Sequence, residues 1–248
     1  MSACDRLRSL HVPGAPLLLP NVWDVATARA VVAAGFPVVA TTSSGVAAAL
    51  GYADHEGAPA AEMFAAAARI ARGVEAPVTV DAEAGYGMEP AELVAALLSA
   101  GAAGCNLEDT DHSTGRLRDL DEQAGRLEAV RQAASAEGYG LVINARVDVF
   151  RTGVALELQE ALVPEAVRRA RAYFEAGADC VYPIGLWEPD ALRRFVSEVP
   201  GPVNVIRLPR TPPLAELAAL GVARVSWAAS LYRQAMARFT EQLATLRA

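Results

Sequence analysis

The 248-residue chain contains only three cysteines, Cys4, Cys105 and Cys180, which are far apart and form no CxxC pair. This spacing argues against structural disulfides and a cysteine-ligated zinc site, and it fits a reducing, cytoplasmic environment. Cys105 and Cys180 lie inside expected strands, so we expect buried thiols rather than nucleophiles. Positive charge is also scarce: 22 basic residues stand against 29 acids, for a net charge of −7. A nucleic-acid-binding surface is not expected, because such surfaces are basic.

Long hydrophobic runs are missing as well. Residues 1–16 contain no apolar core of about 7–15 residues, so we expect no signal peptide. No uninterrupted apolar stretch reaches about 18 residues, so we expect no membrane-spanning helix. Hydrophobic residues still make up 53% of the chain and charged residues only 21%, which predicts a large core. Since no proline- or serine-rich linker divides the chain, residues 1–248 are expected to form a single domain.

Short apolar segments alternate with longer alanine-rich segments. The apolar segments are rich in valine, isoleucine and leucine, which is typical of strands buried on both faces of a parallel sheet. The alanine-rich segments have helical composition, and Pro90, Pro164 and Pro189 stand where three helices are expected to begin. The expected strands are 17–20, 37–41, 78–81, 104–107, 141–144, 180–183, 203–206 and 224–227, and the expected helices lie near 24–34, 60–72, 90–100, 121–136, 164–176, 189–198, 213–220 and 229–246.

Glycine ends several of the expected helices. At Gly35, Gly101, Gly177 and Gly221, the end of a helix is followed within a few residues by the next strand. Glycine accepts the left-handed conformation that stops a helix. Eight strand–helix units in a chain of about 250 residues predict an α/β fold of the TIM-type (β/α)8 barrel class. A doubly wound open sheet is the alternative architecture.

Four acids occur near the expected strand ends, where the catalytic side chains of such barrels lie. They are Asp54, Asp81, Glu83 and Glu108. Carboxylates gathered on one rim repel one another unless a cation joins them, and Mg²⁺ prefers oxygen ligands. Asp81 and Glu83 would point the same way if the strand continues through both. The four acids together predict a Mg²⁺ site, with Mn²⁺ as the alternative ion, although any single acid could cap a helix or face solvent.

The segment VDAEAGYG at 80–87 resembles the D-x-D-x-G-Y-G motif of the isocitrate lyase / phosphoenolpyruvate mutase superfamily. Further segments resemble motifs of the same family in the same order, close to expected strand ends, and together they span nearly the whole chain. They are TTSSG at 41–45, LGYADHE at 50–56, NLED at 106–109, INARVD at 143–148, GPVNV at 201–205 and ARVSWAASLYR at 223–233.

The resemblance implies a TIM barrel whose last helix is often exchanged between subunits in a dimer of dimers. It also implies enolate chemistry on α-keto acids, in which C–C or C–P bonds are made or broken beside Mg²⁺. The expected partners are a small carboxylate substrate and further copies of this chain, as a dimer or homotetramer, but neither nucleic acid nor membrane. The amphipathic segment 229–246 is the expected contact between subunits, unless it packs on its own barrel.

The resemblance also implies roles for individual residues. Asp81 would hold the metal most directly, and Asp54, Glu83 and Glu108 would hold it directly or through bound water. Arg146 would bind substrate oxygens, because its planar guanidinium matches a carboxylate or an enolate.

The remaining expected site residues bind the substrate or move protons. His112 could be a general acid or base, although a solvated loop histidine is the alternative, and the same two interpretations apply to His55. The expected catalytic residues are Arg146, Glu108 and His112, and the expected substrate-binding residues are Thr42, Ser43, Ser44, Gly45, Asp54 and Asn204.

Two departures from the family bear on the reaction. The isocitrate and methylisocitrate lyases carry KKCGH after strand three, which supplies a catalytic cysteine, whereas here the segment 85–90 leads directly into a helix. The mutases and phosphonopyruvate hydrolases carry a longer loop with lysine and asparagine where this chain has 110–119, which contains neither residue. The sequence therefore fits a less defined branch of the family with a generic α-keto acid site.

We expect a Mg²⁺-dependent lyase that acts on a small α-keto acid or a 2-hydroxy di- or tricarboxylate through an enolate. Decarboxylation of an oxaloacetate-like acid or retro-aldol C–C cleavage is the first expectation. The alternative reaction is that of a phosphonopyruvate/phosphoenolpyruvate mutase or C–P hydrolase. The alternative outside enzymes is a non-catalytic α-keto acid binding protein.

Overall fold

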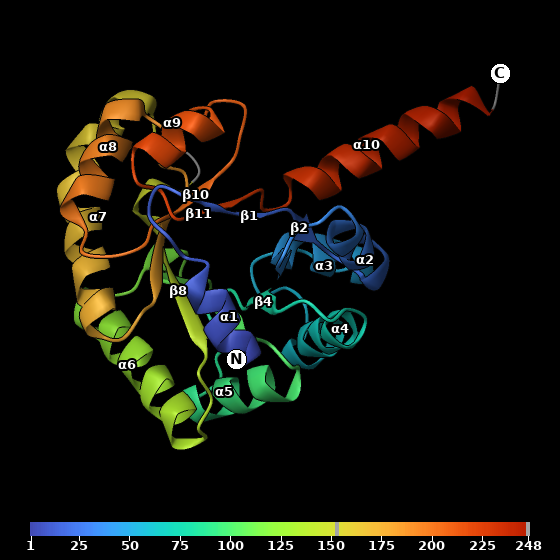
Figure 1. The fold of residues 1–248 in the computed structure, drawn as a ribbon, viewed down its shortest axis with the longest axis horizontal. Helices are drawn as coiled ribbons and strands as arrows, with labels where there is room; N and C mark the ends of the chain where they lie inside the picture. The colour runs from blue at the N-terminus through green and yellow to red at the C-terminus, as the bar shows by residue number, and fades with distance from the viewer. Residues whose placement is uncertain (152–153, 247–248) are drawn as a thin grey trace.

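The computed structural model describes residues 1–151 and 154–246, and its main strands form a parallel barrel (Figure 1). These strands are β1 (Leu17–Leu19), β2 (Asn21–Val22), β3 (Val39–Thr41), β4 (Val78–Asp81), β5 (Gly104–Glu108), β8 (Val142–Val147), β9 (Cys180–Pro183), β10 (Asn204–Ile206) and β11 (Arg224–Ser226). One hydrogen-bonded run has the order β2-β3-β4-β5-β8-β9, and a second has the order β1-β11-β10. A parallel bridge between Val181 and Val203 joins β9 to β10. Since only Pro20 separates β1 from β2, the two runs close into one ring.

Helices surround the barrel on its outer side (Figure 1). Their apolar residues recur at a spacing of three or four, as in Leu93 and Leu97 of α5 and in Leu127 and Val130 of α6, and all four are buried. Such a stripe stabilises the fold by removing apolar surface from water, at about 25 cal/mol per Å². The helices are α1 (Ala3–Ser9), α2 (Val25–Ala33), α3 (Ser43–Leu50), α4 (Ala60–Arg72), α5 (Pro90–Ser99), α6 (Leu120–Ala136), α7 (Leu156–Glu175), α8 (Pro189–Glu198), α9 (Leu214–Ala219) and α10 (Ser230–Thr245).

The predicted TIM-type barrel is confirmed, and each expected strand is present with ends shifted by a few residues. Pro90 and Pro189 begin helices, as predicted. The expected start at Pro164 is wrong, because α7 begins at Leu156 and Pro164 lies inside it. A proline within a helix removes one backbone hydrogen bond. The apolar face of this 20-residue helix, with Val163, Ala166 and Ala170 fully buried, keeps it continuous across that point.

Two helices were not predicted. α1 begins at a capping box formed by Ser2 and Asp5. α3 begins inside the TTSSG segment at 41–45, so the serines at 43 and 44 form the first turn of a helix. A short hairpin of β6 (Thr110–Asp111) and β7 (Arg116–Leu117) follows β5, and a single 3₁₀ turn, η1 (Asp148–Phe150), follows β8.

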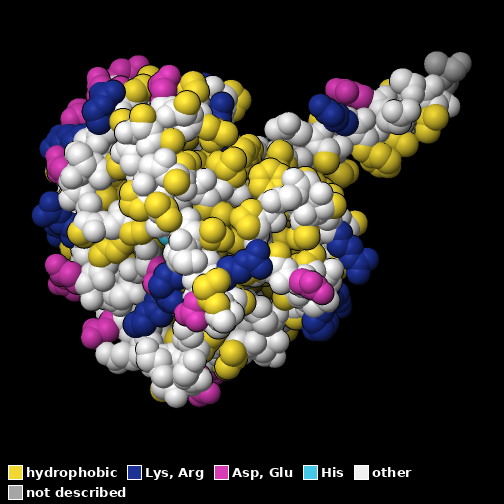
Figure 2. Space-filling view, in the orientation of Figure 1, with side chains coloured by type: hydrophobic (Ala, Val, Ile, Leu, Met, Phe, Trp, Pro, Cys, Tyr) yellow, Lys and Arg dark blue, Asp and Glu magenta, His cyan; other side chains and the backbone are white. Residues whose placement is uncertain are grey.

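The last helix, α10, projects away from the barrel (Figure 1). None of its residues is buried, and its side chains Met236, Phe239 and Leu243 are exposed. Figure 2 shows hydrophobic side chains gathered along one side of this helix. Among the described residues, no helix is both long and apolar enough to cross a membrane.

Candidate active site

A cleft of about 350 Å³ opens where the strands end at their carboxyl side. The strands and the segments that follow them supply its walls, so residues far apart in the sequence face the same space. Nine of the predicted site residues line it: Thr42, Ser43, Ser44, Asp54, Asp81, Glu83, Glu108, His112 and Arg146.

Two predicted substrate-binding residues lie elsewhere. Asn204 is fully buried in the barrel, where its amide donates a hydrogen bond to Ser226 Oγ at 3.2 Å. Gly45 is packed within α3, and a Cβ at this position would lie 2.7 Å from Thr42 Cγ2 and 3.3 Å from Trp23 Cβ. Neither residue lines the cleft. The structure therefore corrects the expected direct contacts: Asn204 supports a strand, and Gly45 lets the first turn of α3 pack closely.

Asp81 lies at the end of β4, next to the first turn of α3. The backbone N–H of Ser43 donates to Asp81 Oδ2 at 3.0 Å, and the hydroxyl of Ser43 donates to Asp54 Oδ1 at 3.3 Å. The other oxygen of Asp81, Oδ1, is buried without a hydrogen-bond partner among the described residues. The amides of the first helical turn have no partners within the helix and carry partial positive charge. This corner of the cleft therefore presents an unpaired carboxylate oxygen beside a helix N-terminus.

Glu83 is 2% exposed and lies in a turn beyond β4, with φ of 49°. The strand does not continue through it, so the expected side-by-side placement with Asp81 on one strand face is wrong. Glu83 accepts hydrogen bonds from the Glu56 N–H and the Tyr86 hydroxyl, both at 2.6 Å. Burial raises the pKa of Glu83 to about 7, and the negative charge of Asp81 contributes to the rise, while the Tyr86 hydrogen bond opposes it.

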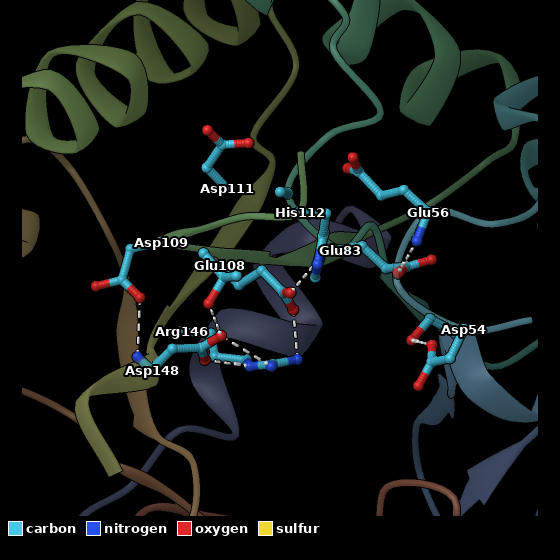
Figure 3. Close-up of polar contacts among 12 residues, drawn as sticks. Asp54, Glu56, Glu83, Glu108, Asp109, Asp111, His112, Arg146 and Asp148 are labelled. Carbon is cyan, nitrogen blue, oxygen red and sulfur yellow. Dashed lines mark hydrogen bonds and ion pairs between the residues drawn. The ribbon is translucent and has the colours of Figure 1, made fainter. Parts of the chain in front are cut away.

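Glu108 is held between two side chains (Figure 3). His112 Nε2 lies 2.6 Å from Glu108 Oε1, and Arg146 Nη1 contacts the other carboxylate oxygen. Burial raises the pKa of Glu108, whereas Arg146 and His112 oppose the rise. The hydrogen bond to Glu108 raises the pKa of His112 despite partial burial. The imidazole of His55 stacks near that of His112, with ring centroids 5.2 Å apart.

Arg146 also contacts Asp148 through two nitrogens, at 2.6 Å for Nε and 3.0 Å for Nη2 (Figure 3). Burial lowers the pKa of Arg146, but Asp148 and Glu108 raise it well above its usual range. Arg146 is thus a permanently charged group on the cleft wall. It also joins the ends of two neighbouring strands, because Arg146 lies on β8 and its partner Glu108 lies on β5.

The four predicted metal-binding acids are not gathered around one point. Among residues 1–151 and 154–246, no three His, Cys, Asp or Glu side chains lie close enough together to hold an ion. Glu108 is engaged by Arg146 and His112, and Glu83 by Tyr86, so direct ligation by all four acids is not what the structure shows. Ligation through bound water stays a prediction.

The residues present nevertheless fit a hard cation. Asp81 offers an unpaired buried oxygen, and both Asp81 and Asp54 accept a hydrogen bond from Ser43. Mg²⁺ is commonly held by one or two carboxylates together with waters and substrate oxygens, and it needs no complete protein cage. Asp81 and Asp54 would hold the ion in this arrangement.

Other cleft residues were missed or left undecided by the sequence analysis. Asn106 lines the cleft two residues before Glu108, and the alternation of side chains along a strand was a signal that could have identified it. Arg151 and Arg233 also line the mouth, as do Tyr182 and Trp187. Arg233 lies in the first turn of α10, and nothing in the residues around it indicates that it would line the cleft.

Asp109, the last residue of the NLED segment, points away from the cleft (Figure 3). It is fully buried, and it accepts hydrogen bonds from the Asp148 N–H at 2.8 Å and the Tyr173 hydroxyl at 2.7 Å. Burial raises its pKa to about 6, and the charge of Asp148 adds to this. Asp109 therefore supports the turn that carries Asp148.

Cys105 and Cys180 are buried, as predicted, and so is Cys4; none of the three lines the cleft. Burial raises the pKa of Cys105 and of Cys180 to about 12. A thiol of this kind is neutral near pH 7 and is neither a nucleophile nor a general base.

Comparisons with known proteins agree with the fold. The family described as phosphoenolpyruvate phosphomutase matches residues 7–247. A crystal structure of a Burkholderia cenocepacia J2315 protein, provisionally ascribed a phosphonomutase activity, has a TM-score of 0.93 and 47% identity, covering 98% of this chain and 99% of that one. The 2-methylisocitrate lyase of Bacillus subtilis is 28% identical over 218 residues, which are 84% of this chain and 68% of that protein. An oxaloacetate acetylhydrolase structure has a TM-score of 0.85 and 25% identity, covering 99% and 87% of the two chains.

Proposed function

Because the chain belongs to the isocitrate lyase / phosphoenolpyruvate mutase superfamily of lyases and mutases, we propose that it cleaves a C–C bond in a small 2-oxo or 2-hydroxy acid. The observation that carries this proposal is the pairing of Asp81 with the first turn of α3. Ser43 N lies 3.0 Å from Asp81 Oδ2, which leaves Oδ1 unpaired. A cation ligand thus stands directly beside an anion-binding helix N-terminus, as a metal-chelated 2-oxo carboxylate requires.

Both the N-terminus of α3 and the carboxylate of Asp81 would take part in substrate binding. The amide of Ser44, in the first turn of α3, would donate to the substrate carboxylate. Asp81 and Asp54 would hold a divalent metal of the kind that members of this superfamily use. When bound, Mg²⁺ supplies Lewis-acid polarisation of the substrate carbonyl. The raised pKa of Glu83, about 7, reduces the negative charge near Asp81 and so limits repulsion of an anionic substrate.

Arg146 and the Glu108–His112 pair would serve the chemical step. When a carboxylate carbon leaves as CO₂ from an oxaloacetate-like acid, the electron pair of the broken C–C bond moves to the carbonyl oxygen and forms an enolate. The Arg146 guanidinium on the cleft wall would stabilise that negative charge. His112, whose pKa is raised by Glu108, would then return a proton to the enolate carbon to give pyruvate.

The amino-acid composition of the chain and the burial of its cysteines exclude two kinds of catalytic residue. Lysine is absent from the whole sequence, so a Schiff-base aldolase mechanism has no nucleophile. The buried thiols of Cys105 and Cys180 leave no cysteine that could act as a general acid in the cleft. The proton donor of this protein would therefore be His112 or a group that contacts it.

Phosphonate chemistry is the second candidate, and two arginines at the mouth of the cleft support it. Arg151 and Arg233 both line the cleft. Their positive charges would bind a second anionic group of the substrate. This group is a distal carboxylate if the protein cleaves a C–C bond and a phosphonate if it carries out phosphonate chemistry. The provisional assignment of a phosphonomutase activity to the 47% identical Burkholderia cenocepacia protein also supports phosphonate chemistry.

Turnover assays separate the candidates. We expect the wild-type protein with Mg²⁺ to convert oxaloacetate, or a 2-hydroxy di- or tricarboxylate, faster than Mg²⁺ alone. Asp81→Asn, which keeps a hydrogen-bond acceptor for Ser43 N, should remove that activity, and EDTA should do the same. Turnover of phosphonopyruvate alone would establish the second candidate. Oxalate binding without turnover of any substrate would show a binding protein, and full activity in EDTA would overturn the metal assignment.

A further inference from the structure

The interior of this barrel is polar below the cleft. Inward-facing positions of TIM barrels are usually filled by bulky branched apolar side chains. Here neighbouring strands place Asp81, Asn106 and Asn144 in register across β4, β5 and β8. Arg224 of β11 joins them from the opposite side of the barrel and is only 1% exposed.

Arg224 is a buried cation without an acidic partner. Among the described residues, no carboxylate lies within salt-bridge distance of its guanidinium, whose contacts are Asn106 Oδ1 at 3.0 Å and His11 Nε2 at 3.5 Å. His11 donates through Nδ1 to Leu7 O at 2.9 Å, which leaves Nε2 as the acceptor. Burial, with the charge of Arg224, lowers the pKa of His11 to about 4, so the imidazole stays neutral. A buried charge with only neutral partners is costly, which suggests that it serves the site.

The contact with Arg224 fixes the orientation of the Asn106 amide. Arginine has donors and no acceptor, so the amide atom that faces it must be the oxygen. Asn144 Nδ2 also donates to this oxygen, at 2.8 Å. Asn106 lines the cleft, and its Nδ2 finds no acceptor in the part of the chain that the structure describes. The two N–H bonds of Nδ2 are therefore available on the side of Asn106 away from Arg224.

We propose that Asn106 is a substrate-binding residue whose Nδ2 donates a hydrogen bond to an anionic oxygen of the 2-oxo acid. Arg224 and Asn144 are the positioning residues that hold its amide oxygen. The position suits this role, because Asn106 stands in register between Asp81 on β4 and Asn144 on β8. A charged donor on Oδ1 also polarises the amide, which makes each N–H of Nδ2 a stronger donor. The proposal rests on the proposed function, since it assumes that a 2-oxo acid occupies the cleft.

The test is Asn106→Asp, which keeps the shape of the side chain and replaces the two donors by an acceptor. The probe is oxalate, a planar mimic of the pyruvate enolate, titrated calorimetrically in the presence of Mg²⁺. We expect its Kd to rise about 10- to 100-fold, as for loss of a hydrogen bond to a charged group. The ligand-free Tm should not fall, because the new carboxylate pairs with Arg224. Gln132→Glu, the same amide-to-acid change on an exposed face of α6, is the control and should leave the Kd unchanged.

A double-mutant cycle tests the role of Arg224 as a positioning residue. Arg224→Lys should weaken oxalate binding in the wild-type background and have no further effect in the Asn106→Asp background. If Arg224→Lys does not fold, Asn144→Ala removes the other donor to the same oxygen and makes the same comparison. Additive effects would overturn the positioning role. An unchanged Kd in Asn106→Asp would overturn the substrate contact alone, whereas failure of the wild-type protein to bind oxalate with Mg²⁺ would overturn this proposal and the proposed function together.

Discussion

At the scale of single residues, the acids of the cleft differ in their partners, and the partners decide what each acid can do. Asp81 keeps one oxygen free, Glu108 is neutralised by Arg146 and His112, and Glu83 is buried against Tyr86. A free buried oxygen attracts a cation, whereas a carboxylate between two donors orients them. In the function we propose, the same residue type would therefore serve metal binding, proton transfer and support within one cleft.

Arg146 should be needed for stability as well as for binding. Its guanidinium contacts Asp148 through two nitrogens and Glu108 through a third, and lysine can satisfy only part of this set. Removing one charge of a buried ion pair lowers the free energy of unfolding by about 3–5 kcal/mol. Arg146→Lys keeps the positive charge, so we expect the free energy of unfolding to fall by only about 1–3 kcal/mol. Calorimetry of Arg146→Lys without ligand should show a Tm lower by roughly 2–10 °C.

The same variant tests ligand binding. For the wild-type protein, oxalate at a hundredfold excess over its Kd stabilises by about 2.7 kcal/mol, or roughly 5–10 °C in Tm, and only with Mg²⁺. Arg146→Lys should lose most of this shift. Arg168→Lys is the control, since Arg168 pairs with Glu165 on an exposed part of α7 and should change neither value. An equally large oxalate shift in Arg146→Lys would contradict the substrate contact.

Glu83 should make the metal-free protein less stable as the pH rises. Its pKa is about 7 in the folded protein and near 4.3 in an unfolded chain, so between these values the folded state binds more protons. Stability is then highest at low pH and is lost as the pH rises towards 7. The side chain of Glu83→Gln cannot ionise. The free energy of unfolding of this variant, relative to that of the wild type, should therefore rise by about 2–3 kcal/mol between pH 5 and pH 8. Denaturant unfolding in EDTA measures this, with exposed Glu128→Gln as the control; a constant difference across this range would contradict the burial argument.

At the scale of secondary structure, the order and type of the main elements could be predicted from the sequence, but local exceptions could not. The apolar runs identified the barrel strands because these strands are largely buried on both sides, and Pro90 and Pro189 mark true helix starts. Pro164 does not mark a helix start, because the buried face of α7 extends on both sides of it. The segment at 43–50 looked like a loop from its serines and glycine, yet packing against Trp23 makes it a helix.

The hairpin of β6 and β7 should depend on Asp111. Its carboxylate accepts hydrogen bonds from the Ser113 hydroxyl at 2.7 Å, from Ser113 N at 2.9 Å and from Thr114 Oγ1 at 3.0 Å, and these hydrogen bonds lower its pKa to about 2. The hairpin carries His112, which contacts Glu108, so its order would bear on the proton transfer that we propose. In Asp111→Ala, we expect faster hydrogen–deuterium exchange at Ser113 and Gly115 with little change in Tm, because the hairpin is a surface element.

The control for this variant is Asp190→Ala, another exposed aspartate that contacts a near neighbour, Arg193, on α8. It should leave exchange in the hairpin unchanged. If exchange at Ser113 in Asp111→Ala equals that of the wild type, the hairpin is held by the rest of its surroundings, and Asp111 has no part in placing His112.

At the scale of the whole molecule, α10 is the feature that a single chain leaves unexplained. The helix is anchored at its start, where Tyr232 meets Trp23 edge to face with ring centroids 5.2 Å apart. Beyond that point it projects from the barrel, and its apolar side chains remain exposed, Phe239 at 56% and Leu246 at 74% (Figures 1 and 2). A row of exposed apolar side chains marks a surface that another protein surface covers. The alternative expectation, that this helix packs on its own barrel, is not what the structure shows.

We propose that α10 packs against a second copy of the chain, as the resemblance to the family implied. Phe239 contributes nothing to the core of one chain, so Phe239→Asp should leave a monomer folded, whereas in an oligomer it would bury an unpaired charge. Sedimentation at micromolar concentration should show wild-type particles of at least twice 26.0 kDa and should show 26.0 kDa monomers for Phe239→Asp. Gln234→Asp, on the opposite side of α10, should stay oligomeric and so control for added charge. Because Arg233 reaches the cleft from the first turn of α10, the monomeric variant should also bind oxalate less tightly. A wild-type protein that sediments only as a monomer would remove the reason for the exposed helix and this account with it.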